Sequence, residues 1–440
     1  MTHPPRVGPK PFVRPVPGRV QTPSIARSTG VLSPSRTSSP HSGGTSAAGL
    51  RTGDAGIRPG RPEMLRRVSL SSVFRSHSSN YYMLLGTTLL LVFIGLIMVL
   101  SASSVDSYLA DSNFFGSFIR QAIYAVIGIP LMLLASRVPI TFWRKWARIF
   151  VLVGIGLQLL VYTPLGIDSY GNRNWFAIGG FTAQPSEALK LALAVWLGVM
   201  LPVTMDRHGS TVRVLRPLIP AVIMLLMVLA GQDLGTVIIM ALMTLAALYF
   251  AGVGWKLMML PISLGVSGVI LMSVVSANRM ARILSFFGKP CLDDSGACWQ
   301  PLHGTWAMAS GGIFGVGLGN SRAKWSWLPA ADNDYIFAII GEELGLIGAI
   351  VVIGLFVVLT ISFLRIIRSA QDPTTRIITG TIMVWLVGQA FINIAVVLNL
   401  LPVLGVPLPF VSAGGTALLA SLTAVGVVLS YARAEGQKVT

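Results

Sequence analysis

Long apolar runs separated by short polar breaks dominate the chain from about residue 80 onward. One run reads LLGTTLLLVFIGLIMVL at 84–100, and about 20 such residues suffice for a helix to cross the ~30 Å hydrocarbon layer of a membrane. The runs are apolar on all sides, whereas a membrane β-barrel alternates apolar and polar residues over segments of about ten. The pattern therefore predicts an all-α polytopic membrane protein.

The spacing of the runs predicts ten transmembrane helices. We expect them at residues 81–103, 116–136, 146–165, 185–205, 215–232, 234–252, 255–276, 335–367, 375–400 and 413–433. The eighth range is long enough to include a segment ahead of the spanning part. A large loop, 277–334, separates the seventh and eighth helices, and a loop of this length in a compact fold is usually functional or disordered.

Basic residues alternate from loop to loop and predict the orientation of the chain. They follow the second, fourth, sixth and eighth helices, as Arg137, Arg144, Lys145, Arg148, Arg207, Arg213, Arg216, Lys256, Arg365, Arg368 and Arg376. The other loops carry Asp106, Asp111, Asp168, Asp293 and Asp294. Because basic loops stay in the cytoplasm, we expect both termini there and the loop 277–334 outside.

The formal net charge of +17 comes mainly from the N-terminal segment rather than from a folded basic surface. Residues 1–80 hold twelve Lys or Arg but only Asp54 and Glu63, among many Pro, Ser and Gly. Such a composition buries too little apolar surface to fold, so we expect residues 1–78 to form a disordered cytoplasmic tail without a signal peptide. It either contacts anionic lipid or partner proteins, or serves as a tether; nucleic-acid binding is not expected. Residues 434–440 form a short cytoplasmic tail.

The predicted outer loop has an unusual composition. It contains Trp299, Trp306, Trp325 and Trp327, and the segment SGGIFGVGLGN at 310–320, which suits a lining that lies along the membrane. It also holds the two cysteines of the chain. Because thiols oxidise readily outside the cytoplasm, we expect a Cys291–Cys298 disulfide; the alternative is two unpaired small residues.

Ionisable residues in or beside spanning helices are candidates for function, since each costs about 2.5–3.5 kcal/mol to insert. They are expected toward the outer half of the bilayer, as Arg120, Arg173, Glu187, Lys190, Asp233, Arg279, Arg282, Lys324, Asp332, Asp334, Glu342 and Glu343. Structural ion pairs are the alternative, above all for Glu187 and Lys190, which share a helix face. Together, cations that suit phosphate and carboxylates that suit a general base predict chemistry or transport on a lipid-linked phosphate.

Four segments resemble sequence motifs of the SEDS family (shape, elongation, division, sporulation), and they occur in the same order. They are NRNWFAIGGFTAQPSEALKLAL, GQDLGT, SGGIFGVGLGNSRAKWSWLPAADNDYIFAIIGEELGLIG and NLLPVLGVPLPFVSAGGTALLA. The resemblance covers residues 79–433. The first span is more similar to the division members than to the elongation members, and the basic N-terminal extension resembles that of actinobacterial proteins.

The resemblance implies a ten-helix peptidoglycan glycosyltransferase that polymerises lipid II into glycan strands. The family's essential acid corresponds to Asp334, which we expect to act as general base with a pKa raised by burial beside Asp332 and Glu342. The family often has Glu-Ala-His where this chain has Ala330-Ala331-Asp332, so Asp332 is a second candidate for the proton. Glu342 and Glu343 lie about 80° and 180° round a helix from Asp334, so at least one is expected to pair elsewhere.

Lipid II binding is expected to use the remaining candidates. The cations for the departing diphosphate are Lys324, Arg282, Arg279, Arg173 and Lys190, and the further substrate-binding candidates are Glu187, Asp233 and Arg120. A divalent cation, Mg or Mn, could assist, although the five histidines, His303 among them, are scattered and form no metal motif.

The resemblance also implies a partner and a location. The expected partner is a septal class B penicillin-binding transpeptidase, together with other division proteins, at the septum of the cytoplasmic membrane. Three alternatives remain at this point: a lipid II flippase, an elongation-type polymerase, and a non-catalytic scaffold that recruits division proteins.

Overall fold

The structure is a computed structural model that describes residues 79–169, 172–179, 181–205, 211–275, 277–287, 298–325 and 327–439. The chain divides into two units, Met1–Arg67 and Val68–Thr440, and every described residue belongs to the second. The predicted N-terminal tail, residues 1–78, therefore lies outside the described residues.

Helices make up most of the described chain, and one small sheet interrupts them. The helices are α2 (Ser79–Ala102), α3 (Ser104–Asp111), α4 (Gly116–Arg137), α5 (Ile140–Leu160), α6 (Pro185–Met205), α7 (Thr211–Ala230), α8 (Leu234–Phe250), α9 (Trp255–Val275), α10 (Ala277–Phe287), α11 (Trp299–Gly311), α12 (Ile336–Ser369), α13 (Pro373–Met383), the π-helical turn η2 (Val384–Gly388), α14 (Gln389–Val397) and α15 (Gly415–Val439). The strands are β1 (Gly166–Ser169), β2 (Asn172–Ile178) and β3 (Phe181–Ala183).

Each of the ten ranges predicted from hydropathy contains a long helical segment. Among the described residues, six segments are long and apolar enough to cross a membrane, namely α2, α4, α6, α12, the continuous run from α13 to α14, and α15. Helices α7, α8 and α9 carry shorter apolar stretches. Helix α5 begins six residues before its predicted range and ends at Leu160 rather than at 165. The prediction of a mostly helical membrane protein is confirmed.

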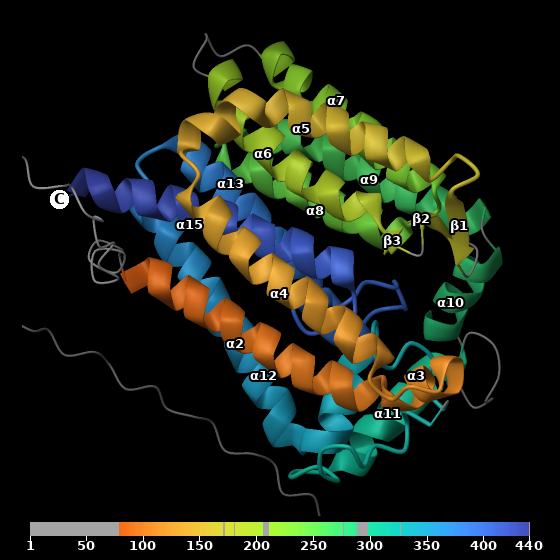
Figure 1. Ribbon diagram of the computed structural model, residues 1–440. Coiled ribbons are helices and arrows are strands. Elements are labelled where there is room, and N and C mark those ends of the chain that lie inside the picture. Colours follow the sequence, from red (N-terminus) through yellow and green to blue (C-terminus); the bar gives the residue numbers. More distant parts are fainter. Residues whose placement is uncertain are drawn as a thin grey trace, which may run out of the picture. The chain divides into compact units, whose positions relative to one another are not determined.

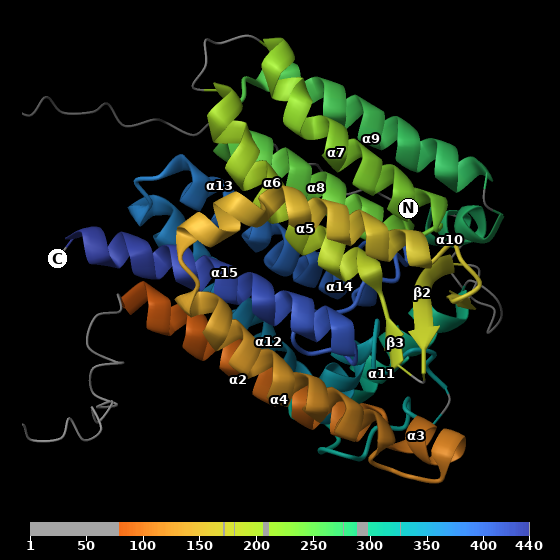
Figure 2. The same ribbon diagram turned by 45° about the horizontal axis from the view of Figure 1, so that its top comes forward.

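The two ends of the helical bundle differ in chemistry (Figures 1 and 2). One end holds the start of α2, the turn from α4 to α5, the turn from α12 to α13, and the end of α15. Here Arg433 donates to the backbone oxygen of Arg137 at 2.9 Å and Arg144 pairs with Asp372. The sheet, α10 and α11 lie at the other end. Those basic residues used for the orientation that the structure describes thus gather opposite the sheet.

Helix α12 is broken at Gly345, whose φ of +67° is left-handed. The segment 312–317 fills the break: Val316 and Gly317 donate backbone hydrogen bonds to the oxygens of Glu342 and Glu343 at 2.9 and 3.0 Å. In return, the oxygens of residues 312 and 313 accept from the amides of residues 346 and 347. A broken helix at membrane depth is tolerated where other backbone satisfies it.

Close backbone approach explains the glycines of this segment. A Cβ on Gly315 would lie 2.2 Å from the oxygen of Glu343, and one on Gly345 would lie 2.3 Å from the nitrogen of Gly315. The apolar side chains between the glycines point outward, since Phe314 is 80% exposed. The segment predicted to lie along the membrane is therefore also a structural insert in α12.

Glu342 and Glu343 are both buried and both bind the segment 319–324. Glu342 accepts hydrogen bonds from Ser321 Oγ at 2.5 Å and the amide of Arg322 at 2.9 Å. Glu343 accepts from Ser101 Oγ at 2.6 Å and lies 3.5 Å from Lys324 Nζ. At least one of the two was expected to pair elsewhere; the structure places both away from Asp334, in contacts that hold the loop to α2 and α12.

Candidate functional site

Asp334 lies in a short turn between α11 and α12, and its backbone is fixed by three successive hydrogen bonds. The carbonyl oxygens of Asp332, Asn333 and Asp334 accept from the amide of Ala413 at 2.8 Å, Ser412 Oγ at 2.6 Å and Asn393 Nδ2 at 2.7 Å. These donors belong to α14 and to the loop between α14 and α15. Every residue of the Asp-Asn-Asp turn is thus held by the last part of the chain.

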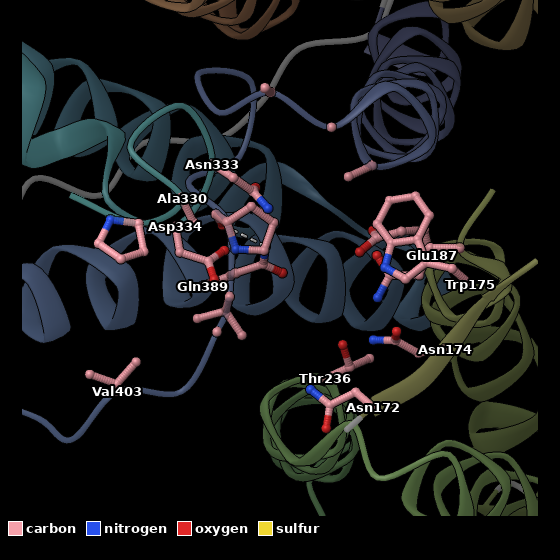
Figure 3. A pocket seen from close by; sticks show the side chains of 18 of the residues that line it. Asn172, Asn174, Trp175, Glu187, Thr236, Ala330, Asn333, Asp334, Gln389 and Val403 are labelled. Atoms are coloured by element: carbon pink, nitrogen blue, oxygen red, sulfur yellow. Dashed lines mark hydrogen bonds between the residues drawn. The ribbon is translucent and has the colours of Figure 1, made fainter. Parts of the chain in front are cut away.

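The side chain of Asp334 faces a cavity of about 640 Å³ (Figure 3). Asp334 and Asn333 lie on one side of the cavity, and Glu187 and Trp175 lie on the other. Apolar residues of the loop after α14 complete the wall. The cavity is lined by Asn172, Asn174, Trp175, Gln184, Glu187, Lys190, Thr236, Arg282, Trp299, Gln300, Pro329, Ala330, Asn333, Asp334, Gln389, Val403, Gly405, Val406, Pro407, Ala413, Gly414 and Ala417.

The environment of Asp334 suits a proton acceptor. The pKa of its carboxyl is raised to about 6, chiefly by burial and next by the negative charge of Asp233; Arg282 opposes the shift and Asp332 supports it. Oδ1 of Asp334 is buried and has no hydrogen-bond partner among the described residues. A general base works best when its pKa lies near the working pH, so the shift brings Asp334 toward that role.

Glu187 and Lys190 of α6, which the sequence suggested as an ion pair, line part of the cavity. Lys190 Nζ lies 2.9 Å from Glu187 Oε1, donates to Gln389 Oε1 at 3.1 Å and sits 5.0 Å from the ring centre of Trp385. Both charged side chains are almost fully buried, and both line the cavity. The pair is therefore a structural ion pair that also lines the cavity. The sequence had left these as two alternatives.

Asp233, at the start of α8, accepts hydrogen bonds from residues that form another wall of the cavity. Its Oδ1 caps the helix by accepting from the amide of Thr236 at 3.0 Å, and its Oδ2 accepts from Asn174 at 2.9 Å and Gln184 at 3.1 Å. A Cβ on Gly235 would lie 2.5 Å from the oxygen of Leu404. The GQDLGT motif thus joins β2, α8 and the loop after α14 around one carboxylate.

Arg282 connects this cavity with a second one of about 400 Å³. The two cavities share five lining residues, namely Asn172, Asn174, Arg282, Val403 and Gly405. Side chains of α8, α9 and α10 give the second cavity an apolar wall, which includes Ile238, Val269 and Ile283. A guanidinium beside such an apolar wall suits a molecule with a phosphate and a hydrocarbon part.

Several residues predicted to contact substrate lie elsewhere. Lys324 donates to the oxygen of Gly319 at 2.6 Å and pairs with Glu343, and it lines neither cavity. Arg173 donates to the oxygen of Thr163 at 2.9 Å and also lines neither cavity. Arg120 is exposed and donates to Ser117. These side chains bind other parts of the protein. The prediction failed for them because a sequence shows a charge but not the direction in which its side chain points.

Two predictions concern residues that lie partly outside the described part of the chain. Nothing is described of the side chain of Arg279 or of residue Cys291. The role of Arg279 and the disulfide between Cys291 and Cys298 therefore stay predictions.

Polar amides are central to the site, and the sequence interpretation overlooked the two on α14. Gln389 donates to the oxygen of Pro407 at 2.8 Å, and Asn393 donates to the oxygens of Asp334 and Val406. Gln121, next to Arg120, donates to the oxygen of Ser412 and accepts from the amide of Gly414, both at 3.1 Å. Their signal was present, since an amide inside an apolar run is as unusual as a charge.

No group of three or more His, Cys, Asp or Glu residues that could hold a metal ion occurs in the described part of the chain. Asp334 and Glu187 enter the cavity from separate sides. Because Mg²⁺ is often held by one or two carboxylates together with substrate phosphates, a requirement for Mg or Mn stays a prediction.

Comparison with known proteins gives a consistent set of relatives. A sequence model of the cell cycle protein family, which joins FtsW, RodA and SpoVE, matches residues 81–437. Proteins from Mycobacterium bovis and Mycobacterium tuberculosis, each named probable peptidoglycan glycosyltransferase FtsW, are 37% identical over 82% of this chain and 69% of theirs. Stage V sporulation protein E of Bacillus subtilis is 36% identical over 79% of this chain and 95% of its own.

Solved structures agree on the fold. A chain from a structure described as "Structural coordination of polymerization and crosslinking by a peptidoglycan synthase complex" has a TM-score of 0.64, with 80% of this chain and 97% of that chain covered. Thermus thermophilus RodA has a TM-score of 0.60, with coverages of 82% and 98%. Both are 20% identical in sequence, so they establish the shared architecture. The chain belongs to the SEDS family, the FtsW, RodA and SpoVE group of cell cycle proteins.

Proposed function

We propose that the chain polymerises lipid II into peptidoglycan strands during septal wall synthesis, with Asp334 as the general base. Its curated FtsW relatives are named peptidoglycan glycosyltransferases and share more than a third of their aligned residues with it. The residue assignment rests on the carboxyl of Asp334, whose pKa is raised to about 6. One of its oxygens has no hydrogen-bond partner among the described residues, and its side chain lines a cavity that also holds cations and amides.

In this proposal, the 4-hydroxyl of the acceptor's GlcNAc attacks the anomeric carbon of the lipid-linked donor strand. The C–O bond to the diphosphate breaks, the glycosidic bond forms, and the hydroxyl proton passes to Asp334. General-base catalysis of this kind contributes about 10²–10⁴-fold. Asn393 acts as a positioning residue, because it fixes the backbone of Asp334 without facing the reacting atoms.

Arg282 is the best-placed cation for the departing diphosphate, since it lines both cavities. A guanidinium binds phosphate oxygens through paired, charge-assisted hydrogen bonds. The apolar wall from α8, α9 and α10 suits the undecaprenyl chain. Lys190 contributes positive charge on the far side, although Glu187 neutralises much of it at 2.9 Å.

The proposal includes an arrangement in the membrane. Ten helical segments cross the cytoplasmic membrane at the septum, both termini lie in the cytoplasm, and the loop 277–334 faces outward with Asp334. The gathering of basic side chains at the end opposite the sheet supports this orientation. The partner is a septal class B penicillin-binding transpeptidase; a structural neighbour described as part of a complex for polymerisation and crosslinking supports it.

The main alternative is a lipid II flippase. A transport path needs polar groups from one face of the membrane to the other, whereas the cavities described here gather near the sheet end of the bundle. The test places the purified protein and its partner in proteoliposomes with fluorescent lipid II. Glycan polymer on a gel without accelerated translocation supports the proposal; translocation without polymer contradicts it.

A further inference from the structure

A third cavity, of about 460 Å³, lies along α11 and takes no part in the proposed chemistry. We call it the tryptophan basin. It is formed by α11, residues 322–325 and 327, and the start of α12, and it is lined by His303, Trp306, Ala307, Ser310, Arg322, Ala323, Trp325, Trp327 and Glu342.

One face of α11 connects the basin to the cavity that contains Asp334. Trp299 lines the Asp334 cavity and stacks on His303 of the basin, with ring centres 4.2 Å apart. His303, Trp306 and Ser310 follow Trp299 at helical spacing, so this face extends over about 16 Å. A chain that leaves the Asp334 cavity past Trp299 would reach the basin directly.

The basin combines flat apolar surfaces with a few polar groups. Trp306, Trp325 and Trp327 are 50%, 63% and 58% exposed, and an indole offers a broad apolar face together with one N–H donor. His303 is 96% buried, and its Nε2 has no hydrogen-bond partner in the described part of the chain. Arg322 adds an exposed cation to the lining.

These features fit a sugar chain better than an acyl chain. A pyranose ring presents C–H groups on its faces, which pack on indoles, and hydroxyl groups at its rim, which need hydrogen-bond partners. A hydrocarbon would offer no acceptor to the indole N–H groups or to the guanidinium of Arg322. Arg322 complements the carboxylates of a stem peptide attached to the sugars.

We propose that the tryptophan basin is a binding subsite for the glycan strand, next to the polymerisation site. Its ligand class is an uncrosslinked chain of N-acetylated amino sugars with acidic stem peptides. The inference rests on the proposed function, because it assigns the product of that reaction to the basin. Sugars retained there would keep the strand near Asp334 between successive additions and so lengthen the product.

Direct binding tests the subsite without catalysis. The full chain with Asp334→Asn, in nanodiscs, is titrated calorimetrically with uncrosslinked peptidoglycan tetrasaccharide that bears its stem peptides. Trp325→Ala and Trp327→Ala are expected to weaken binding at least tenfold. The matched control is Trp255→Ala on α9, which also removes a tryptophan that is 67% exposed but lies outside the basin. Absence of saturable binding, or equal losses in all three variants, overturns the proposal.

Arg322→Gln tests the role of the stem peptide. It is expected to weaken binding of the peptide-bearing tetrasaccharide while leaving binding of the peptide-free tetrasaccharide unchanged. Equal effects on both ligands would contradict the assignment of Arg322. The backbone hydrogen bond from Arg322 to Glu342 is retained in this variant, since only the side chain changes.

Product length separates the subsite from the proposed function. With Asp334 intact and the transpeptidase partner present, Trp325→Ala and Trp327→Ala are expected to shorten the glycan strands made from lipid II, whereas Trp255→Ala is not. If the basin variants make strands of wild-type length, the proposal of a glycan subsite is contradicted, whereas the proposed polymerase function is retained. A wild-type protein that binds the tetrasaccharide but makes no polymer overturns the polymerase and leaves the basin as a glycan-binding site.

Discussion

Asn393 Nδ2 donates to the backbone oxygens of both Asp334 and Val406, at 2.7 and 2.8 Å. One amide of α14 thus ties the turn before α12 to the loop after α14. The site is assembled from parts of the chain that are far apart in sequence, and the position of Asp334 depends on this contact.

Asn393→Ala is expected to lower the rate of polymerisation more than it lowers affinity for lipid II, because the mutation frees the backbone of Asp334. Two lost hydrogen bonds also reduce the free energy of unfolding by about 1–3 kcal/mol. The control is Thr381→Ala, a buried polar residue of helix α13 whose hydroxyl donates within its own helix, to the oxygen of Ile377. Steady-state kinetics check the prediction; a change in KM alone would contradict the positioning role.

The rate of polymerisation is expected to rise with pH through about 6 and then level off, because Asp334 must be deprotonated to accept a proton. Asp332→Asn removes a negative neighbour that raises this pKa, so the rise should move to lower pH. Arg282→Gln removes a cation that lowers it, so the rise should move to higher pH. Profiles of kcat/KM measure both shifts; a profile unchanged in either variant would refute the electrostatic account.

The same pKa shift predicts a change of stability with pH. The folded state holds the proton of Asp334 more tightly than the unfolded chain, whose ordinary aspartate pKa is about 3.9. Asp334 therefore contributes stability at acidic pH that is lost as the pH rises through about 6. Asp334→Asn should flatten this part of the profile in thermal unfolding, and a wild-type profile that matches that of the variant would contradict the shift.

Lys324 and Arg282 are expected to behave differently when mutated, although the sequence suggested the same role for both. Lys324→Met leaves Glu343 buried without its cation, which costs about 3–5 kcal/mol of stability. Arg282→Gln is expected to weaken lipid II binding with little loss of stability, since Arg282 lines both cavities. Thermal unfolding and binding measured on both variants check this; a stable Lys324→Met variant with weak substrate binding would restore the sequence-based role.

Gly315→Ala should destabilise the protein, because the added Cβ would lie 2.2 Å from the oxygen of Glu343 and the residue has a φ of +81°. Overpacking of this kind costs about 1–3 kcal/mol. Gly354→Ala in helix α12 is the control: apart from the backbone of its own helix, no atom of the described residues lies within 4 Å of its added Cβ, and the exchange favours the helix by about 1 kcal/mol. Thermal unfolding in detergent should therefore move in opposite directions, and a shift in the same direction would contradict the insert in α12.

The helices could be predicted from the sequence because the length and uniformity of apolar runs reflect the thickness of a membrane. The break at Gly345 could not, since it depends on backbone of the segment 312–317 that arrives from outside the helix. The π-helical turn before Gln389 also escaped prediction, because one extra residue in a turn leaves hydropathy unchanged. The short strands β1 to β3 hold too few residues to show a pattern.

The charged part of the site was predictable because charge beside a membrane is expensive. That rule found Asp334, Asp233, and the pair Glu187 and Lys190, all of which lie in or against the cavity. It misplaced Lys324, whose partner Glu343 comes near only through the folding of the loop. Glu342 was expected beside Asp334, but it binds Ser321 of the loop instead. The acidic residue with the largest effect on the pKa of Asp334 is Asp233.

The comparison of Asp334→Asn with Asp332→Asn tests the central claim most directly. Both variants are purified with the transpeptidase partner, shown to retain wild-type thermal unfolding near neutral pH, and given lipid II under identical conditions. The account predicts that Asp334→Asn loses at least about 100-fold in glycan polymer, while Asp332→Asn keeps most of its activity. Polymer made at the wild-type rate by Asp334→Asn, or lost only in Asp332→Asn, would show that another group accepts the proton.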